Sequence, residues 1–326
     1  MTDRASEDRS SADNSLDADG SARLGWTVSR RGLLGATAGA VGLSSPAIAG
    51  GAGPTAPGAS PTLHVRIYPG AIPLYARLLY GGPDLAGGWT AIHEAASEAV
   101  EDALGQISDY AATETTLGEL DVVVERRERI GSGLSVSSPL DALTPAATVF
   151  DRFRAAVHDR GLVTGRCCHL LLWWDPLNID LGYGRVRSAN SHVTRQADEG
   201  SQAIANVGAT ELWDDRSVTR NIAIHEVLHS LLSNDVVESV NDSRCDHDLG
   251  SVVAVDEGVR EVSPMATAYE GAGRSGGTRF SGTGCANHDS FSRHDGTADV
   301  DEWRYTTTLS DATKEAVTTY VAERLR

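Results

Sequence analysis

Residues 217–235 read Ser-Val-Thr-Arg-Asn-Ile-Ala-Ile-His-Glu-Val-Leu-His-Ser-Leu-Leu-Ser-Asn-Asp, an apolar segment that also carries two histidines and a glutamate. Two aspartates and Ser217 stand at its start, where acidic and capping side chains favour the beginning of a helix. We therefore predict a helix from about residue 217 to 233. Its apolar residues point in nearly every direction around the axis, which predicts that the helix is buried.

The predicted helix carries the motif His225-Glu226-Val227-Leu228-His229. His225 and His229 lie one turn apart on the same face, so both can bind one zinc ion at about 2.0–2.1 Å. Glu226 points about 100° away around the axis, where it can take a proton from the activated water without being a ligand. The alternative is two core histidines bonded to backbone carbonyls. That alternative is unfavourable, because burying two imidazoles and a carboxylate is costly without a charge to organise them.

The motif resembles that of the metzincins, a family of zinc peptidases with the extended signature His-Glu-x-x-His-x-x-Gly-x-x-His/Asp. The resemblance covers roughly residues 62–270, and the segments 225–235 and 263–269 carry it. It implies Asp235 as the third metal ligand. Leu232 stands where the family has the glycine at which its helix breaks, so the sequence departs from the signature there.

His247 is the alternative third ligand. It follows His229 in sequence and lies between two aspartates, whose carboxylates can fix its tautomer. A neutral imidazole also suits zinc better than a carboxylate does in competition with salt, which favours His247 over Asp235. Glu257 is a weaker candidate. The sequence leaves the choice between His247 and Asp235 open.

The segment Ser263-Pro264-Met265-Ala266-Thr267-Ala268-Tyr269 resembles the Met-turn of the metzincins. The resemblance implies a tight turn that places Met265 beneath the zinc histidines, and Pro264 is compatible with such a bend. The alternative is that Met265 fills a gap in the core. Tyr269 is a candidate catalytic residue, because its hydroxyl can donate a hydrogen bond to the developing oxyanion.

Strand and helix patterns alternate along the rest of the chain. Strands are predicted at 63–68, 120–126, 168–174 and, at a sheet edge, 203–209; helices are predicted at 89–108, 146–160 and 311–326. These patterns predict an α+β fold, in which a mixed twisted sheet packs on helices around a buried active-site helix. The metzincin resemblance implies the same zincin-like catalytic domain. The polar residues after 270 are expected to form a loop and solvated surface.

The charge balance of the chain limits its partners. The formal net charge is −17, from 45 acidic and 28 basic residues, and Lys314 is the sole lysine. Such a field repels nucleic acid and anionic membranes, which argues against both as partners. A surface dense in carboxylates and nearly free of lysine is similar to the proteins of salt-loving archaea, so we expect a halophilic protein.

Residues 1–49 resemble a twin-arginine signal peptide. The segment Ser29-Arg30-Arg31-Gly32-Leu33-Leu34 precedes a mild apolar run that is too short to span a bilayer and that ends in Ala47-Ile48-Ala49. We expect cleavage after Ala49, then a Gly/Pro/Ala linker at 50–61 and a zinc metallopeptidase-like domain at 62–326.

The four cysteines fit an extracellular setting, which permits disulfides. Cys245 with Cys285 is the expected pair, because the adjacent Cys167 and Cys168 rarely bridge each other. We expect at least one of Cys167 and Cys168 to be a buried thiol in an apolar strand.

Together these features predict a secreted zinc-dependent endopeptidase that uses Zn²⁺ as its cofactor. Its expected partners are a protein or peptide substrate and, during export, the twin-arginine machinery, with no stable membrane insertion after signal removal. The alternative is a non-catalytic, zinc-stabilised extracellular binding protein on the same fold.

Overall fold

The structure, a computed structural model, describes residues 60–80, 88–130, 144–162, 166–187, 193, 200–271, 277–284 and 286–325. All of them belong to one structural unit, Pro54–Arg326. The predicted signal peptide, most of the predicted linker and Cys285 lie outside the described residues. Within the described residues, no helix combines the length and the apolar character needed to cross a membrane.

A five-stranded sheet with the strand order β2-β1-β3-β5-β4 forms the centre of this unit. The strands β1 (Thr62–Pro69), β2 (Asp121–Arg126), β3 (Cys168–Trp173) and β5 (Ser201–Asn206) are parallel, and β4 (Gly184–Val186) runs antiparallel to β5. The prediction that residues 203–209 form an edge strand is wrong. β5 is buried along its whole length, because β4, with three residues too short to show an alternating pattern, pairs on its outer side.

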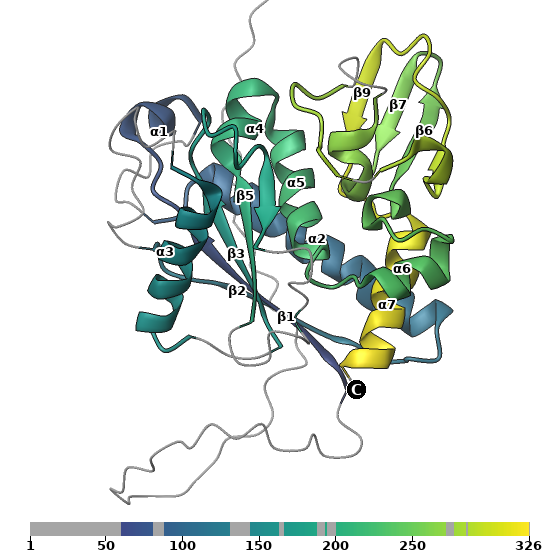
Figure 1. The fold of residues 1–326 in the computed structure, drawn as a ribbon, viewed down its shortest axis with the longest axis horizontal. Helices are drawn as coiled ribbons and strands as arrows, with labels where there is room; N and C mark the ends of the chain where they lie inside the picture. The colour runs from purple at the N-terminus through teal and green to yellow at the C-terminus, as the bar shows by residue number, and fades with distance from the viewer. Residues whose placement is uncertain are drawn as a thin grey trace, which may run out of the picture. The chain divides into compact units, whose positions relative to one another are not determined.

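Helices cover both faces of this sheet (Figure 1). Along β3, Leu170 and Leu172 pack with α2 (Ala91–Glu114) and α5 (Arg216–Leu228), whereas Leu171 and Trp173 pack with α3 (Ala146–Asp159). Successive side chains of a strand point to opposite faces, so a strand covered on both sides needs an unbroken apolar run. The sequence of β3 is such a run from Leu170 to Trp173.

Four further helices and three short 3₁₀ helices complete the helical elements of the described residues. The α-helices are α1 (Leu74–Tyr80), α4 (Val207–Trp213), α6 (Asn234–Asn241) and α7 (Asp311–Arg324). The 3₁₀ helices are η3 (Asp246–Leu249), η4 (Pro264–Tyr269) and η6 (His288–Ser290). α7 packs against α2 and α6.

A second, smaller sheet has the order β8-β6-β7-β9. Its strands are β6 (Ser251–Asp256), β7 (Val259–Val262), β8 (Arg293–His294) and β9 (Glu302–Tyr305). The pair β6 and β7 is antiparallel, and the other two pairs are parallel. The expectation of loop and solvated surface after residue 270 is therefore wrong where β8 and β9 form. Figure 1 shows α5 between the two sheets, which confirms the predicted α+β class, with mixed sheets packed on helices.

Candidate metal centre

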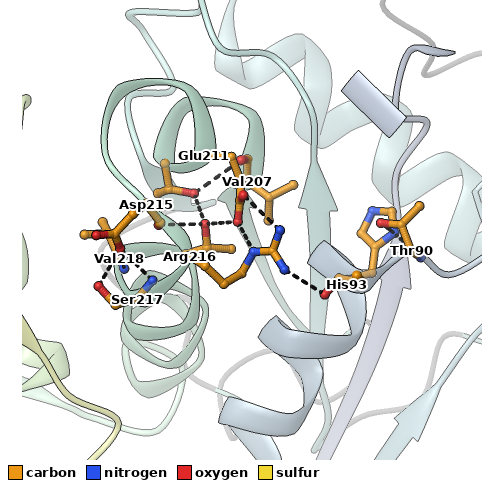
Figure 2. A network of polar contacts seen from close by, with 11 residues as sticks. Thr90, His93, Val207, Glu211, Asp215, Arg216, Ser217 and Val218 are labelled. Carbon is orange, nitrogen blue, oxygen red and sulfur yellow. Dashed lines mark hydrogen bonds and ion pairs between the residues drawn. The ribbon is translucent and has the colours of Figure 1, made fainter. Parts of the chain in front are cut away.

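Arg216 fixes the start of α5 to its neighbours, as Figure 2 shows. Its guanidinium group pairs with the buried Glu211 of α4 (Nη2 to Oε2, 3.0 Å) and donates to the backbone carbonyl of Ala91 at the start of α2 (3.2 Å). Asp215 caps α5, since its carboxylate accepts hydrogen bonds from two backbone N–H groups of the first turn. These contacts hold α5 against α2 and α4 before the motif begins.

α5 ends at Leu228 rather than at the predicted residue 233. Ser230 marks the change: its N–H and its hydroxyl both donate to the carbonyl of Val227, at 3.0 and 2.6 Å, so the last turn tightens. The buried residues Leu231 and Leu232 follow outside the helix. The prediction was wrong because their apolar character reflects burial, not helical structure.

The structure does not bring Asp235 or Glu257 to the motif histidines. Asp235 lies in the first turn of α6, where its exposed side chain pairs with Arg324 of α7. Glu257 is exposed in the turn between β6 and β7. The new helix that starts after α5 carries Asp235 away from the motif.

His247 does join the motif histidines. It lies in η3, and its Nε2 atom is 3.3 Å from Nε2 of His229, which in turn is 2.9 Å from Nε2 of His225. The ring planes of His225 and His229 are nearly perpendicular, as are those of His229 and His247. The three rings therefore direct one nitrogen each toward a common space, and they form a group that can hold a metal ion.

The other ring nitrogens orient the three histidines. His225 donates from Nδ1 to the carbonyl of Pro264 (2.8 Å), and His229 bonds from Nδ1 to Oδ2 of Asp246 (2.6 Å). Nδ1 of His247 lies 3.8 Å from Oδ1 of the same Asp246. Because Nδ1 is engaged in His225 and His229, their Nε2 atoms are left for a ligand in the common space.

The spacing of the nitrogens fits a bound cation. One proton can bridge only one pair of Nε2 atoms at a time, whereas one metal ion can bind all three. Nitrogens held at 2.0–2.1 Å by a tetrahedral zinc ion lie about 3.3 Å from one another. The separations of 2.9 and 3.3 Å are close to that value.

The electrostatics also favour a positive charge at this point. Burial lowers the pKa of His225 well below its ordinary value and that of His247 to about 3, and the charge of His229 adds to both effects. At His229, burial is outweighed by the charge and hydrogen bond of Asp246, which raise the pKa to about 9. Burial raises the pKa of Asp246, but the opposite charge of His229 outweighs it and holds this pKa below its usual range. A single positive charge is therefore favoured among the three rings. A metal ion can supply that charge in place of a proton.

Glu226 is buried beside the histidines, with one oxygen, Oε2, that lacks a hydrogen-bond partner among the described residues. Burial raises its pKa to about 7, against the effect of the positive charge of His229. Gly184 of β4 makes room for the side chain, since a Cβ atom at Gly184 would lie 2.7 Å from Cγ and Cδ of Glu226. A buried carboxyl group with a pKa near neutrality is suited to exchanging protons with a bound molecule.

The segment around Met265 is attached to α5 at two points. Thr267 donates to the side-chain oxygen of Asn221, and the Pro264 carbonyl accepts the bond from His225. Met265 itself is fully buried, in the same core cluster as the apolar residues of α5. The turn therefore supports the helix that carries the motif.

Tyr269, at the end of η4, stacks on His247 with 4.0 Å between the ring centroids. Its hydroxyl accepts a hydrogen bond from the backbone of Gly284. Burial raises the pKa of Tyr269, and the charge of Glu226 adds to the rise, so the hydroxyl keeps its proton at neutral pH. A Cβ atom at Gly284 would lie 2.6 Å from that hydroxyl. Tyr269 is thus a hydrogen-bond donor placed beside the three histidines.

These groups line a cavity of about 500 Å³, which we call the metal cleft. β4 and the segment 280–284 both border the metal cleft. Ile179, Tyr183 and Phe280 add apolar walls. Within the described sheet, β4 is an edge strand, so its outer side can pair with an extended chain.

Sequence reasoning assigned one residue of this centre, Asp246, to a different histidine and missed another, Gly184. The aspartates beside His247 were expected to fix that ring, but the carboxylate of Asp246 lies closest to His229, and Asp248 instead accepts bonds from Ser243 and Asn287. No signal in the sequence identifies Gly184, whose role depends on β4 passing Glu226.

Cys245 is disulfide-bonded, whereas Cys167 and Cys168 are free and buried. Cys285, its expected partner, lies outside the described residues.

Comparison with known proteins gives two distant likenesses. No protein-family model and no curated protein matches the chain. Among solved structures, it is similar to metalloproteinase-II from Bacteroides fragilis, with 15% identity and a TM-score of 0.29 over 56% of this chain and 45% of that one. It is also similar to a chain in a chaperone-substrate complex, with 14% identity and a TM-score of 0.28 over 80% and 35%. The chain thus spans less than half the length of either, and at these scores neither likeness bears on function.

Proposed function

We propose that the protein is a secreted zinc-dependent endopeptidase, with His225, His229 and His247 as the metal ligands. The convergence of their three Nε2 atoms beside the unpartnered carboxylate oxygen of Glu226 carries this proposal. Three imidazoles with space for a further ligand are typical of catalytic zinc sites, whereas structural sites are closed and usually hold cysteine. The only described thiols that are free, Cys167 and Cys168, lie in or next to β3 and are not part of this group.

The chemistry that zinc supplies in such a site is Lewis-acid activation of a water molecule and of a peptide carbonyl. Glu226 accepts the proton of the attacking water and returns it to the leaving amine, a role that suits its pKa of about 7. Tyr269 donates its hydroxyl proton in a hydrogen bond to the developing oxyanion. β4 binds the substrate backbone as an added strand and so orients the scissile bond in the metal cleft.

We extend the proposal to the setting of the protein. Residues 1–49 act as a twin-arginine signal, 50–61 as a linker, and the domain from 62 works outside the cell in concentrated salt. The arginine pair, the short apolar run and the net charge of −17 with a single lysine support this part of the proposal.

A Glu226→Gln variant tests the mechanism. The amide keeps the shape of the side chain but cannot accept the proton, so casein digestion should fall by at least about a hundredfold while zinc content stays the same. Glu238→Gln on α6 is the matched control, since Glu238 is exposed and is not among the residues that line the metal cleft. Undiminished digestion by Glu226→Gln would rule out the mechanism. A zinc-binding protein without digestion in either form would instead be the non-catalytic alternative.

The third ligand is tested by comparing His247→Ala with Asp235→Ala. We expect zinc affinity to fall by at least about tenfold in the first variant, because one of three nitrogens is lost. Asp235→Ala removes only an exposed ion pair and should bind zinc as the parent does. Unchanged zinc affinity in His247→Ala, measured by competition with a chelator, would contradict the assignment.

A further inference from the structure

A second cavity, of about 650 Å³, lies across the segment 277–284 from the metal cleft. We call it the acidic pocket. It is lined by aromatic and acidic side chains from the junction of α4 and α5 and from β9 with the residue before it, namely Trp213, Asp214, Asp215, Asp301, Trp303 and Tyr305. Phe280 separates the two cavities, since its ring meets Trp213 edge-on at 6.0 Å and Tyr183 of the metal cleft at 5.3 Å.

Carboxylates outnumber cations around the acidic pocket. Among the described residues, Asp214 accepts hydrogen bonds from the backbone N–H of Arg279, and Asp215 is engaged as the cap of α5. Glu302 also lines the pocket, but Arg304 pairs with it at 2.7 Å. The exposed Arg279 is the one basic residue among the described lining.

Glu270 adds a buried carboxyl group directly behind this wall. It is 1% exposed, and its Oε1 accepts hydrogen bonds from two lining residues, the hydroxyl of Tyr305 (3.1 Å) and the N–H of Thr278 (3.0 Å). Its Oε2 has no partner among the described residues. Burial raises the pKa of Glu270 to about 7, and the charge of Asp214 adds to the rise. A cation bound in the pocket would therefore favour the ionised form of Glu270, which burial alone disfavours.

We propose that the acidic pocket binds the guanidinium group of an arginine side chain carried by a peptide. A guanidinium group is planar, stacks on aromatic rings and donates to several carboxylates at once, which matches indole and phenol walls beside Asp214 and Asp301. A metal ion fits less well, because no three ligand atoms of the described lining are close enough to hold one. A role of the acidic pocket in binding substrate rests on the proposed peptidase function. Its ability to bind a guanidinium group does not depend on that function.

The test is a calorimetric titration of the full protein at constant ionic strength with Nα-acetyl-arginine amide and with its neutral isostere, Nα-acetyl-citrulline amide. We expect the arginine compound to bind at least about fivefold more tightly, the factor that corresponds to about 1 kcal/mol. Asp301→Asn and Asp214→Asn should each weaken arginine binding by a similar factor. Asp289→Asn, which changes an exposed aspartate of η6, is the control and should bind as the parent does. If Asp214→Asn disturbs the hydrogen bond from Arg279, Asp301→Asn alone still tests whether the pocket carboxylates bind arginine.

Equal affinity for the two compounds, no binding of either, or unchanged binding in both pocket variants would overturn the proposal. The two proposals can fail separately. Arginine binding that survives zinc removal in a protein without peptidase activity would leave the acidic pocket standing and remove the proposed function. Equal kcat/KM for arginine and citrulline peptides, with no binding of the arginine amide, would leave the proposed peptidase function standing and remove the guanidinium site.

Discussion

The two ends of α5 carry similar polar residues in opposite arrangements. At its start, the guanidinium group of Arg216 faces the carboxylate of Glu211, and the hydroxyl of Thr219 donates to that same carboxylate (2.9 Å). At its end, His225 and His229 direct Nε2 atoms at each other, and Glu226 leaves one oxygen without a described partner. The first arrangement pairs its polar groups within the described residues, whereas the second leaves the Oε2 atom of Glu226 without a partner among them.

This difference separates stability from function along one helix. Buried polar groups that are satisfied internally stabilise a particular packing, and removing one partner is costly. Buried polar groups that converge without partners are costly until a ligand binds, and such groups concentrate at functional sites. We therefore expect metal to bind at the end of α5 and substitutions of Arg216 to affect stability at its start. A change at one end should have little effect at the other.

Metal removal should have the largest effect. Zinc at about a thousand times its dissociation constant stabilises the folded state by about 4 kcal/mol, which raises Tm by about 10 °C in a domain of this size. Calorimetry of chelator-treated protein with and without added zinc, at fixed salt, measures this difference. Magnesium at the same concentration is the control, because it prefers oxygen ligands. Identical Tm values with and without zinc would show that the histidines are satisfied without a metal.

Arg216→Ala should have the next largest effect. It leaves the carboxylate of Glu211 buried and unpaired, since that side chain is 3% exposed, and should lower the free energy of unfolding by about 3 kcal/mol. Zinc affinity, measured by competition with a chelator, should not change. The double variant Arg216→Ala with Glu211→Gln should recover part of the loss, because the buried group is then neutral. A parallel loss of zinc affinity in Arg216→Ala would mean that the ends of α5 are coupled.

Part of this centre can be predicted from sequence because its chemistry is local. His225, Glu226 and His229 lie within one helical turn, so their spacing alone places two rings on one face. The strand at 168–173 and the helices at 91–114 and 311–324 also follow from local apolar patterns, which is why the predicted fold class is confirmed.

The remaining parts depend on contacts between distant segments. Whether His247 or Asp235 lies beside His229 depends on how α6 and η3 pack after the chain leaves α5, and no local sequence pattern predicts that packing. The role of Gly184 depends on β4, a three-residue strand that forms by pairing with β5. The smaller sheet was missed for the same reason, since its strands are short and two of its three pairs join segments distant in sequence.

Gly184→Ala tests how much space the side chain of Glu226 needs at the end of α5. The added methyl group would overlap Glu226, which supplies its three nearest atoms, so peptidase activity should fall by about tenfold, or about 1.4 kcal/mol, with zinc content unchanged. Gly105→Ala on α2 is the matched control, because a Cβ atom there would meet nothing within 4 Å. Activity equal to that of the parent would show that Glu226 need not occupy its observed position.

The smallest effect concerns Asp214, which lies next to the complete network at the start of α5 but is outside it. Burial raises its pKa from 3.8 to about 6, with the backbone N–H of Arg279 acting in the opposite direction. Below about pH 3.8 both the folded and the unfolded states are protonated at this group. As the pH rises toward 6 the unfolded state ionises first, so the folded state loses stability there and the loss is constant above that range.

Asp214→Asn should remove this loss. Because the carboxyl group is only half-buried, solvent screening limits the effect to about 1 kcal/mol. The variant should therefore gain stability relative to the parent as the pH rises from about 4 to 6, and the gain should reach about that value and stay constant above pH 6. Denaturant unfolding at several pH values and constant salt measures it. Asp289→Asn should show no such gain. If Asp214→Asn followed the parent across the whole range, Asp214 would have an ordinary pKa, and the start of α5 would hold no unbalanced charge.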